Sequence, residues 1–208
     1  MIPVKVLAVQ YLNNCAPSLL KALGVSQKLP SLGLLTTDCD DATFIALDGA
    51  TKAAEVEVVY GRSFYAGASN ASTPYAGEVL GILAGATPGA VKSGMEAALE
   101  ILSRVGFQNV KGIPCLSCTV PSTGSFLSRE AGIPQGGALA YLIAPPLEAV
   151  YGLDAALKAA DVKLSAFYAP PTQTNFGGGL LTGTQSACAS ASEAFLEAVA
   201  EVAERPVK

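Results

Sequence analysis

The stretch DGATKAAEV at residues 48–56 returns as DAALKAADV at residues 154–162, 106 positions further along the chain. Two more pairs match in the same order: Gly85 with Gly183, and EAALE at residues 96–100 with EAFLE at residues 193–197. Matches that keep their order along a chain are typical of a repeated structural unit. The 208 residues are therefore predicted to form two copies of one unit, with domains over residues 1–104 and 105–208.

The two copies differ in the length of one loop. The separation between matching residues falls from 106 at Val56 to 98 at Gly85, so the first copy has the longer connection between these two positions. Loops longer than about 12 residues are usually functional or disordered. The loop over residues 61–77 and its counterpart over residues 169–179 are therefore candidate functional segments.

Both copies show the same order of apolar runs and helical stripes, which predicts the same secondary structure twice. The expected strands cover residues 4–11, 31–37, 56–60 and 78–84, then 115–120, 138–144, 162–168 and 180–182. The expected helices cover residues 17–23, 41–54 and 88–102, then 125–131, 146–160 and 186–203. We expect an α+β fold in which each unit has a sheet on one side and helices on the other.

Composition excludes several classes of protein. Half of the residues are hydrophobic, which excludes a disordered chain. The net charge of −4 argues against nucleic-acid binding. The chain has no histidine, which excludes Ser-His-Asp and Cys-His relays and His-ligated zinc. Only 14% of the residues are charged, against about 25% in typical soluble domains, so we expect other subunits to cover much of the surface.

No membrane span or targeting segment is expected. The longest uncharged stretch covers residues 164–192, but Pro170, Pro171 and the glycines at 177–179 interrupt it. A spanning helix needs about 20 mostly apolar residues. The expected location is therefore the cytoplasm.

The five cysteines are predicted to be reduced thiols, because their number is odd and no signal peptide precedes them. Cys115 and Cys118 form a single C-x-x-C, which lacks the two further ligands of a structural zinc site. The following residues 119–121 favour a strand, so two structural thiols are the preferred interpretation. A metal held by several copies around a symmetry axis is the alternative; within one chain no metal site is expected.

Residues 140–162, AYLIAPPLEAVYGLDAALKAADV, and residues 179–183, GLLTG, resemble the bacterial microcompartment shell domain. In the first copy the resemblance runs through residues 31–34 and 48–56. Two such domains in one chain resemble the tandem-domain shell proteins, which form homotrimers shaped like hexamers. The extra strand and helix before each copy resemble the circularly permuted branch, and residues 56–68 are similar to its ethanolamine-utilization members.

This resemblance implies a structural protein of a microcompartment shell within the cytoplasm. It implies no enzymatic activity, no nucleic-acid or membrane partner, and edge contacts with other shell proteins. It also implies small acidic pores that admit ethanolamine. The residues expected there are Asp40, Asp41, Glu78, Phe107 and Thr182.

Paired carboxylates beside an aromatic face suit a cation such as protonated ethanolamine. Two other roles remain open for Asp40 and Asp41: capping of the helix that begins there, and general acid/base catalysis. We expect the Asp41 carboxylate to be exposed, so that its replacement would cost little stability.

The resemblance further implies that the two long loops meet at the threefold axis and open or close a central pore. The residues expected to form this gate are Arg62, Phe64, Tyr65, Tyr75, Asn175, Phe176 and Gly177. The glycines at 177–179 would supply the backbone freedom for that movement. No bound cofactor is expected, although a cobalamin is a candidate for transport or binding.

Three functions compete at this point. A shell tile would form flat sheets with hexagonal order. A regulatory protein built from two α+β repeats would bind a small molecule at the repeat interface and remain a discrete oligomer. An enzyme restricted to Asp, Glu, Cys or Tyr is the least favoured, because histidine and cofactor motifs are absent.

Overall fold

The computed structural model describes residues 1–64, 79–170 and 172–207, which form two compact units. One unit comprises Pro3–Val105 and Gly124–Leu127. The other comprises Met1–Ile2, Gly106–Thr123 and Ser128–Lys208. The segment Gly124–Leu127 therefore belongs with the first repeat in space, although it follows the start of the second repeat in sequence.

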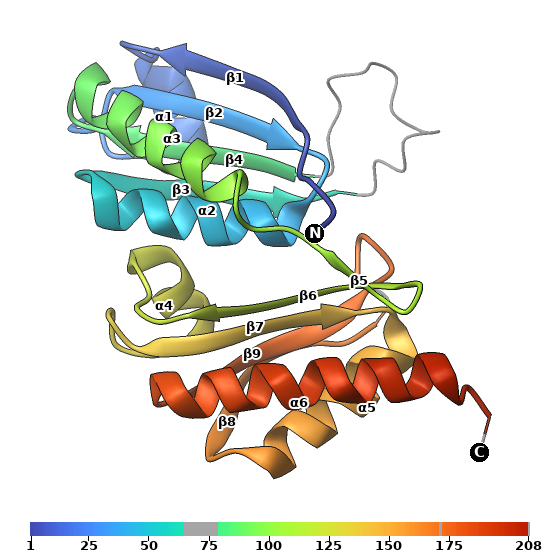
Figure 1. The fold of residues 1–208 in the computed structure, drawn as a ribbon. Coiled ribbons are helices and arrows are strands. Elements are labelled where there is room, and N and C mark those ends of the chain that lie inside the picture. Colours follow the sequence, from blue (N-terminus) through green and yellow to red (C-terminus); the bar gives the residue numbers. More distant parts are fainter. Residues whose placement is uncertain (65–78, 171, 208) are drawn as a thin grey trace. The chain divides into compact units, whose positions relative to one another are not determined.

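The first unit contains an antiparallel sheet with the strand order β1-β2-β4-β3. Its elements are β1 (Val6–Leu12), α1 (Pro17–Leu23), β2 (Ser31–Thr37), α2 (Asp40–Ala53), β3 (Val56–Ser63), β4 (Val79–Gly85) and α3 (Pro88–Leu102). Helices α2 and α3 pack on one face of this sheet (Figure 1). They approach closely because glycine faces them: a Cβ on Gly81 would lie 2.6 Å from Leu47 Cδ1.

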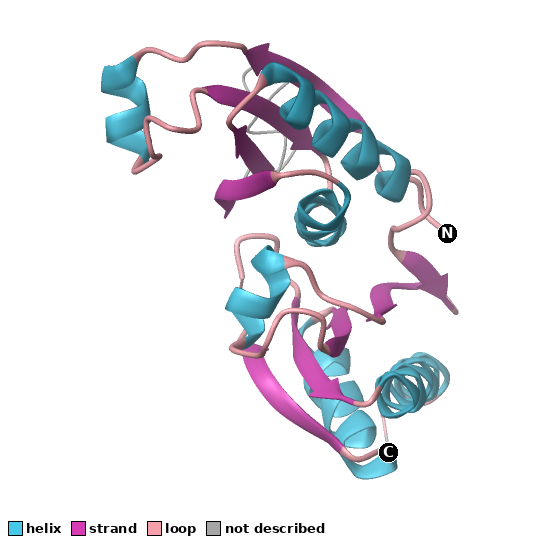
Figure 2. Ribbon diagram, turned by 90° about the vertical axis from the view of Figure 1, so that its left-hand side faces the viewer, coloured by secondary structure: helices cyan, strands magenta, loops and turns pink. Residues whose placement is uncertain are grey.

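The opposite face of the first sheet is covered by α1 and the segment around it. Leu20 of α1 joins Leu32 and Ile82 in a buried cluster. Figure 2 shows this short helix apart from the α2–α3 pair. The expectation that helices lie on only one side of the sheet is therefore wrong for the first unit, because the strands bury apolar side chains on both faces.

The second unit repeats this arrangement. Its elements are β5 (Gln108–Val110), β6 (Ile113–Val120), β7 (Ala138–Ala144), α5 (Pro146–Ala159), β8 (Val162–Tyr168), β9 (Gly177–Gly183) and α6 (Gln185–Glu204), while α4 (Ser125–Ala131) is shared between the two units. The strand order β5-β6-β7-β9-β8 contains the order of the first sheet, with β5 added at the edge. The predicted doubled α+β unit is confirmed.

The added strand β5 was not predicted from the sequence. It forms a hairpin with β6 through Lys111 and Gly112, whose φ angles are 52° and 93°. Two positive φ values are typical of the tight turn that matches the twist of a hairpin. The Asn109 side chain accepts a hydrogen bond from the Gly112 backbone N–H at 2.6 Å, which holds the turn.

One predicted loop boundary is wrong. The glycines at 177–179 were expected in a flexible loop, but they begin β9 and pair with β7 and β8. A Cβ on Gly178 would lie 1.9 Å from the Leu142 carbonyl oxygen, and one on Gly179 would lie 2.5 Å from that of Ala166. Here glycine permits close approach between strands rather than movement. The other predicted elements agree with the structure within three residues.

Asp48 of α2 holds the segment Gly124–Leu127 in the first unit. Its fully buried carboxylate accepts hydrogen bonds from the backbone N–H groups of Gly124 (2.7 Å, Oδ2) and Leu127 (2.8 Å, Oδ1). The Lys52 ammonium lies 3.5 Å from the same carboxylate. Gly124 is required because a Cβ there would lie 2.5 Å from the Asp48 carbonyl oxygen.

We predict that Asp48→Ala lowers the free energy of unfolding by about 3 kcal/mol, because it leaves two buried N–H groups without an acceptor. Chemical denaturation followed by circular dichroism measures this. Asp161→Ala, which removes an exposed carboxylate, is the matched control and should change stability by less than about 0.5 kcal/mol. Equal stabilities of the two variants would contradict the assigned role.

Candidate functional site

The turn from β2 into α2 fixes the position of the two predicted pore aspartates. The Thr37 hydroxyl lies 2.7 Å from the Thr43 hydroxyl and accepts a hydrogen bond from the Cys39 backbone N–H at 3.1 Å. The Thr43 hydroxyl donates to the Cys39 carbonyl at 2.8 Å. These bonds tie the end of the strand to the first turn of the helix, so Asp40 and Asp41 start α2 in one defined orientation.

Capping by Asp40 or Asp41 is not what the structure shows. The N-cap residue of α2 is Cys39, in extended conformation, and no side chain caps the helix. Both aspartates lie inside the first turn, where a negative charge still interacts favourably with the helix dipole. The capping interpretation is therefore wrong.

Asp40 is a buried carboxyl that is held by several hydrogen bonds, one of them with the Asp41 side chain. Its Oδ2 accepts a hydrogen bond from the Ser63 hydroxyl at 2.6 Å, and its Oδ1 accepts one from the Asp41 backbone N–H at 2.9 Å. Burial raises the pKa of the Asp40 carboxyl above its usual range, and these hydrogen bonds oppose the rise. Within the described residues, no basic side chain is among the groups that lower this pKa.

Asp41 is buried to the same extent: both aspartates are 7% exposed. The expectation of an exposed Asp41 carboxylate is wrong, because the end of β3 packs over the start of α2 and places Ser63 there. The negative environment also reaches Cys39. Burial, followed by the charges of Asp41 and its neighbours, raises the pKa of the Cys39 thiol well above its usual range.

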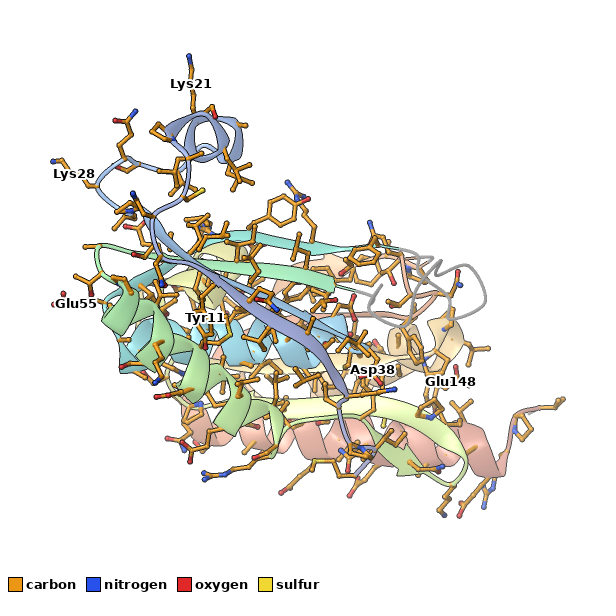
Figure 3. The ribbon with its side chains drawn as sticks, turned by 90° about the horizontal axis from the view of Figure 1, so that it is seen from above. Tyr11, Lys21, Lys28, Asp38, Glu55 and Glu148 are labelled. Atoms are coloured by element: carbon orange, nitrogen blue, oxygen red, sulfur yellow. The ribbon has the colours of Figure 1, made fainter. Side chains whose placement is uncertain are left out.

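A third carboxylate, Asp38, marks the exposed side of this acidic turn. Its Oδ1 accepts a hydrogen bond from the Lys5 backbone N–H at 2.8 Å, which ties the start of β1 to the end of β2. Figure 3 shows Asp38 at the end of the first sheet that lies away from Lys21 and Lys28. The acidic turn and α1 therefore occupy opposite ends of this sheet.

The structure places the other predicted pore residues as follows. Phe107 lies in the second unit, where its ring packs edge-on against Phe176 at a centroid distance of 5.2 Å. Thr182 lies in β9 of the same unit, with its hydroxyl 2.7 Å from that of Ser165. Glu78 lies outside the described residues. Phe107 and Thr182 belong to one unit and the two aspartates to the other, so their grouping in one pore stays a prediction.

The predicted gate residues are distributed over both units. Arg62 belongs to β3 and the half-exposed Phe64 follows that strand. In the second unit, Asn175 has a positive φ of 63° and precedes Phe176 and Gly177, the latter being the first residue of β9. Tyr65 and Tyr75 lie outside the described residues. The role of this set as a gate stays a prediction.

Sequence reasoning missed Ser63 as a partner of Asp40. Ser63 lies 23 residues from Asp40 in sequence. The only sequence feature that could have indicated this contact is a hydroxyl side chain, next to Arg62, shortly after a predicted strand. The strand was predicted to end at Tyr60, and its extension to Ser63 is what brings the hydroxyl to the carboxyl.

The C-x-x-C pair lies in β6, as predicted for two thiols of a strand. Burial raises the pKa of the Cys115 thiol to about 11, so this sulfur stays protonated at neutral pH. Among the described residues, no three His, Cys, Asp or Glu side chains form a cluster that could hold a metal. No helix in the described part of the chain is long and apolar enough to cross a membrane.

Comparison with known proteins gives the family. The BMC domain matches residues 31–114. The bacterial microcompartment shell protein EutL of Clostridium perfringens is 56% identical over all of this chain and 97% of that protein. The chain belongs to the bacterial microcompartment shell proteins. The EutL of Escherichia coli is 45% identical over all of this shell protein and 97% of that protein.

Solved structures agree with this assignment. The ethanolamine utilization protein EutL of Leptotrichia buccalis superimposes with a TM-score of 0.96 at 54% identity, covering all of this chain and 97% of that one. The EutL of Clostridium perfringens gives a TM-score of 0.95 at 56% identity, covering all of this chain and 96% of that one. The trimeric shell protein PduB shares the fold, with a TM-score of 0.81 at 21% identity over 96% of this chain and 89% of that one.

We predict that Asp40→Asn stabilises this shell protein at pH 7.5 and that the gain shrinks as the pH falls toward 4. The folded protein binds a proton at Asp40 more tightly than the unfolded chain does, so wild-type stability falls as pH rises between the two pKa values. At a pH above both pKa values, each unit by which folding raises the pKa lowers the free energy of unfolding of the wild type by about 1.4 kcal/mol. Thermal melts of both proteins from pH 4 to 8 measure the effect.

An Asp40→Asn variant that is less stable than wild type at pH 7.5 would contradict the prediction. Asp38→Asn is the control for a nearby, exposed carboxylate, and it should show no comparable gain at pH 7.5.

Proposed function

We propose that this chain forms a homotrimeric tile in the shell of an ethanolamine-utilization microcompartment and that its acidic turn binds the substrate amine. The observation that carries the shell assignment is full-length similarity to relatives named as microcompartment shell proteins. The similarity extends over both repeats, so it concerns the whole architecture and not a single domain.

The trimer is supported by the doubled unit and by composition. Three chains of two units supply six similar units, which is the number needed to fill a hexagonal position in a sheet. The charged fraction of 14% fits a surface that is covered by neighbouring subunits and by other shell proteins at its edges. The shell protein PduB, which has the same fold, is described as trimeric.

The amine site is supported by the electrostatics of Asp40 and Asp41. Two adjacent buried carboxyl groups pay a desolvation penalty when they ionise. A protonated primary amine would offset that penalty with opposite charge and with N–H donors. A hydroxyl such as that of ethanolamine would find acceptors in the same acidic turn.

The proposed role needs no catalysis. The same trimer axis is the proposed position of the gated central pore, through which a molecule as large as a cobalamin would pass. The contact between Phe107 and Phe176 supports an aromatic closure, because the two rings already pack in the second unit.

The tile is tested by electron microscopy and sedimentation of the purified protein. We predict a trimer in solution and flat arrays with hexagonal order at high protein concentration. A discrete oligomer that never forms arrays and assembles only with a small molecule would favour the regulatory alternative. A stable monomer at micromolar concentration would contradict the trimer.

The amine site is tested by titration calorimetry with ethanolamine. We predict that Asp41→Asn weakens binding at least about tenfold, because it removes one of two charges that face the ammonium group. Asp161→Asn, at an exposed carboxylate of the second unit, should bind as wild type does. Thermal melts confirm that both variants are folded. Equal affinity of Asp41→Asn and wild type would contradict the site.

A further inference from the structure

Ser63 connects the end of strand β3 to the acidic turn. Its hydroxyl donates a hydrogen bond to Asp40 Oδ2 at 2.6 Å, and the Asp41 backbone N–H donates to Asp40 Oδ1 at 2.9 Å. Donors on both oxygens fix the rotation of the Asp40 carboxyl group. One of these donors comes from the helix that carries Asp40, and the other comes from a different element of the fold.

The spacing of residues on α2 and β3 explains why Ser63 meets Asp40. The two elements run side by side in the first unit (Figure 1). Asp40 and Phe44 are one turn apart on α2, which is about 6 Å along the helix axis. Gly61 and Ser63 point to the same face of β3 and are about 6.6 Å apart along the strand. Because these intervals nearly match, the contact of Gly61 with Phe44 places Ser63 at Asp40.

The close approach of β3 to α2 depends on the glycine at position 61. A Cβ there would lie 3.2 Å from Phe126 Cζ and 3.4 Å from Phe44 Cε1. The first distance is shorter than the optimal separation of two carbon atoms, about 3.5–4.0 Å. The two rings pack on each other at a centroid distance of 5.9 Å, and Phe126 belongs to the segment that Asp48 holds in this unit. This aromatic pair therefore limits how near Gly61, and with it Ser63, can come to α2.

The second repeat lacks this combination of groups. The counterparts of Asp40, Gly61 and Ser63, 106 positions further along the chain, are Pro146, Phe167 and Ala169. Helix α5 and strand β8 nevertheless contact each other in the second unit. The packing of this helix on this strand therefore does not itself require the carboxyl, the glycine or the hydroxyl, which indicates that they serve the acidic turn.

The Ser63 hydroxyl also favours the charged form of Asp40. Burial raises the pKa of the Asp40 carboxyl, and the bond from Ser63 is the largest of the hydrogen bonds that oppose this rise. An ammonium group interacts more strongly with a carboxylate than with a protonated carboxyl. Loss of the hydroxyl would therefore raise the pKa further and reduce the fraction of molecules that can bind an amine.

The other titratable groups near Asp40 come from three elements. Those of its own turn are Asp38, Cys39 and Asp41. On β3, Arg62 is exposed, and the alternation of side chains directs it to the face opposite Ser63. Before β1, the exposed Lys5 binds Asp38 through its backbone N–H. The segment Gly124–Leu127 has no titratable side chain, so within the described residues the direct contact from another element is the Ser63 hydroxyl.

We propose that Ser63 is a positioning residue of the amine site, whose hydroxyl orients the Asp40 carboxylate and keeps it in the charged form that binds an ammonium group. The contact of Gly61 with Phe44 and Phe126 determines the distance at which it does so. This inference rests on the proposed amine site and adds to it a residue and the packing that places that residue.

Titration calorimetry with ethanolamine from pH 5 to 8 tests the role of the hydroxyl. We predict that Ser63→Ala weakens binding at pH 7.5 at least about fivefold, because one hydrogen bond to a charged group is lost. The profile of affinity against pH should also move to higher pH, because the carboxyl then releases its proton less readily. Ser63→Thr keeps the hydroxyl on a residue that strands favour, and it should restore both affinity and profile.

Ser31→Ala is the matched control. It removes a hydroxyl of the same sheet that donates to the Asn13 carbonyl at 3.0 Å, at the opposite end of β2 from the acidic turn. This control should bind ethanolamine as wild type does at every pH. Thermal melts of all variants show that they are folded.

The outcomes separate this inference from the proposed function. If Asp41→Asn weakens binding while Ser63→Ala keeps the affinity and the pH profile of wild type, the role of Ser63 is overturned and the amine site stands. Equal loss of affinity in Ser63→Thr and Ser63→Ala overturns the hydrogen bond as the cause. A wild type that does not bind ethanolamine overturns both proposals.

A second variant tests the packing without changing the hydroxyl. Gly61→Ala should push β3 away from α2, weaken ethanolamine binding and move the pH profile in the same direction as Ser63→Ala. Adding Phe126→Leu, which removes the Cζ atom nearest to the new methyl group, should restore part of the affinity. Gly89→Ala is the control, because a Cβ there meets no listed neighbour closer than 3.9 Å. Wild-type affinity in Gly61→Ala overturns the packing as the cause.

Discussion

The buried carboxylate of Asp48 is the interaction on which the arrangement of the chain depends. Two backbone N–H groups at Gly124 and Leu127 donate to it, and no solvent competes with them. A carboxylate in such a place is stabilising only while it keeps its donors. The segment that supplies them lies 76 residues further along the chain. A single side chain of the first repeat therefore holds a segment of the second repeat within the first unit.

The acidic turn holds a second buried carboxyl in a different environment. Asp40 is also buried, and burial raises the pKa of its carboxyl although the Ser63 hydroxyl and the Asp41 backbone N–H donate hydrogen bonds to it. Asp48 has Lys52 at 3.5 Å, whereas no cation is among the groups that lower the pKa of Asp40. This difference separates a carboxylate that has a cation beside it from a buried carboxyl that is held by hydrogen bonds, and it is the physical argument for the amine site proposed at Asp40 and Asp41.

Much of the fold could be predicted from the sequence, because the repeat and its apolar periods are local signals. The strands Ser31–Thr37 and Ala138–Ala144 begin and end where their apolar runs do. The hairpin strand Gln108–Val110 was missed because three residues are too few to show the alternation of apolar and polar side chains that indicates a strand. At the site, Asp40 and Asp41 could be selected from their type and place, but their burial could not, because Ser63 and the end of β3 reach them through tertiary packing.

Duplication within one chain also lets equivalent positions diverge. The counterparts of Asp40 and Asp41 in the second repeat are Pro146 and Leu147, so the acidic turn occurs once in two units. A hexamer of identical single-domain subunits would carry six such turns, each with two buried carboxyl groups. A trimer of duplicated chains carries three, so the number of carboxyl groups that must be desolvated in the assembly is halved.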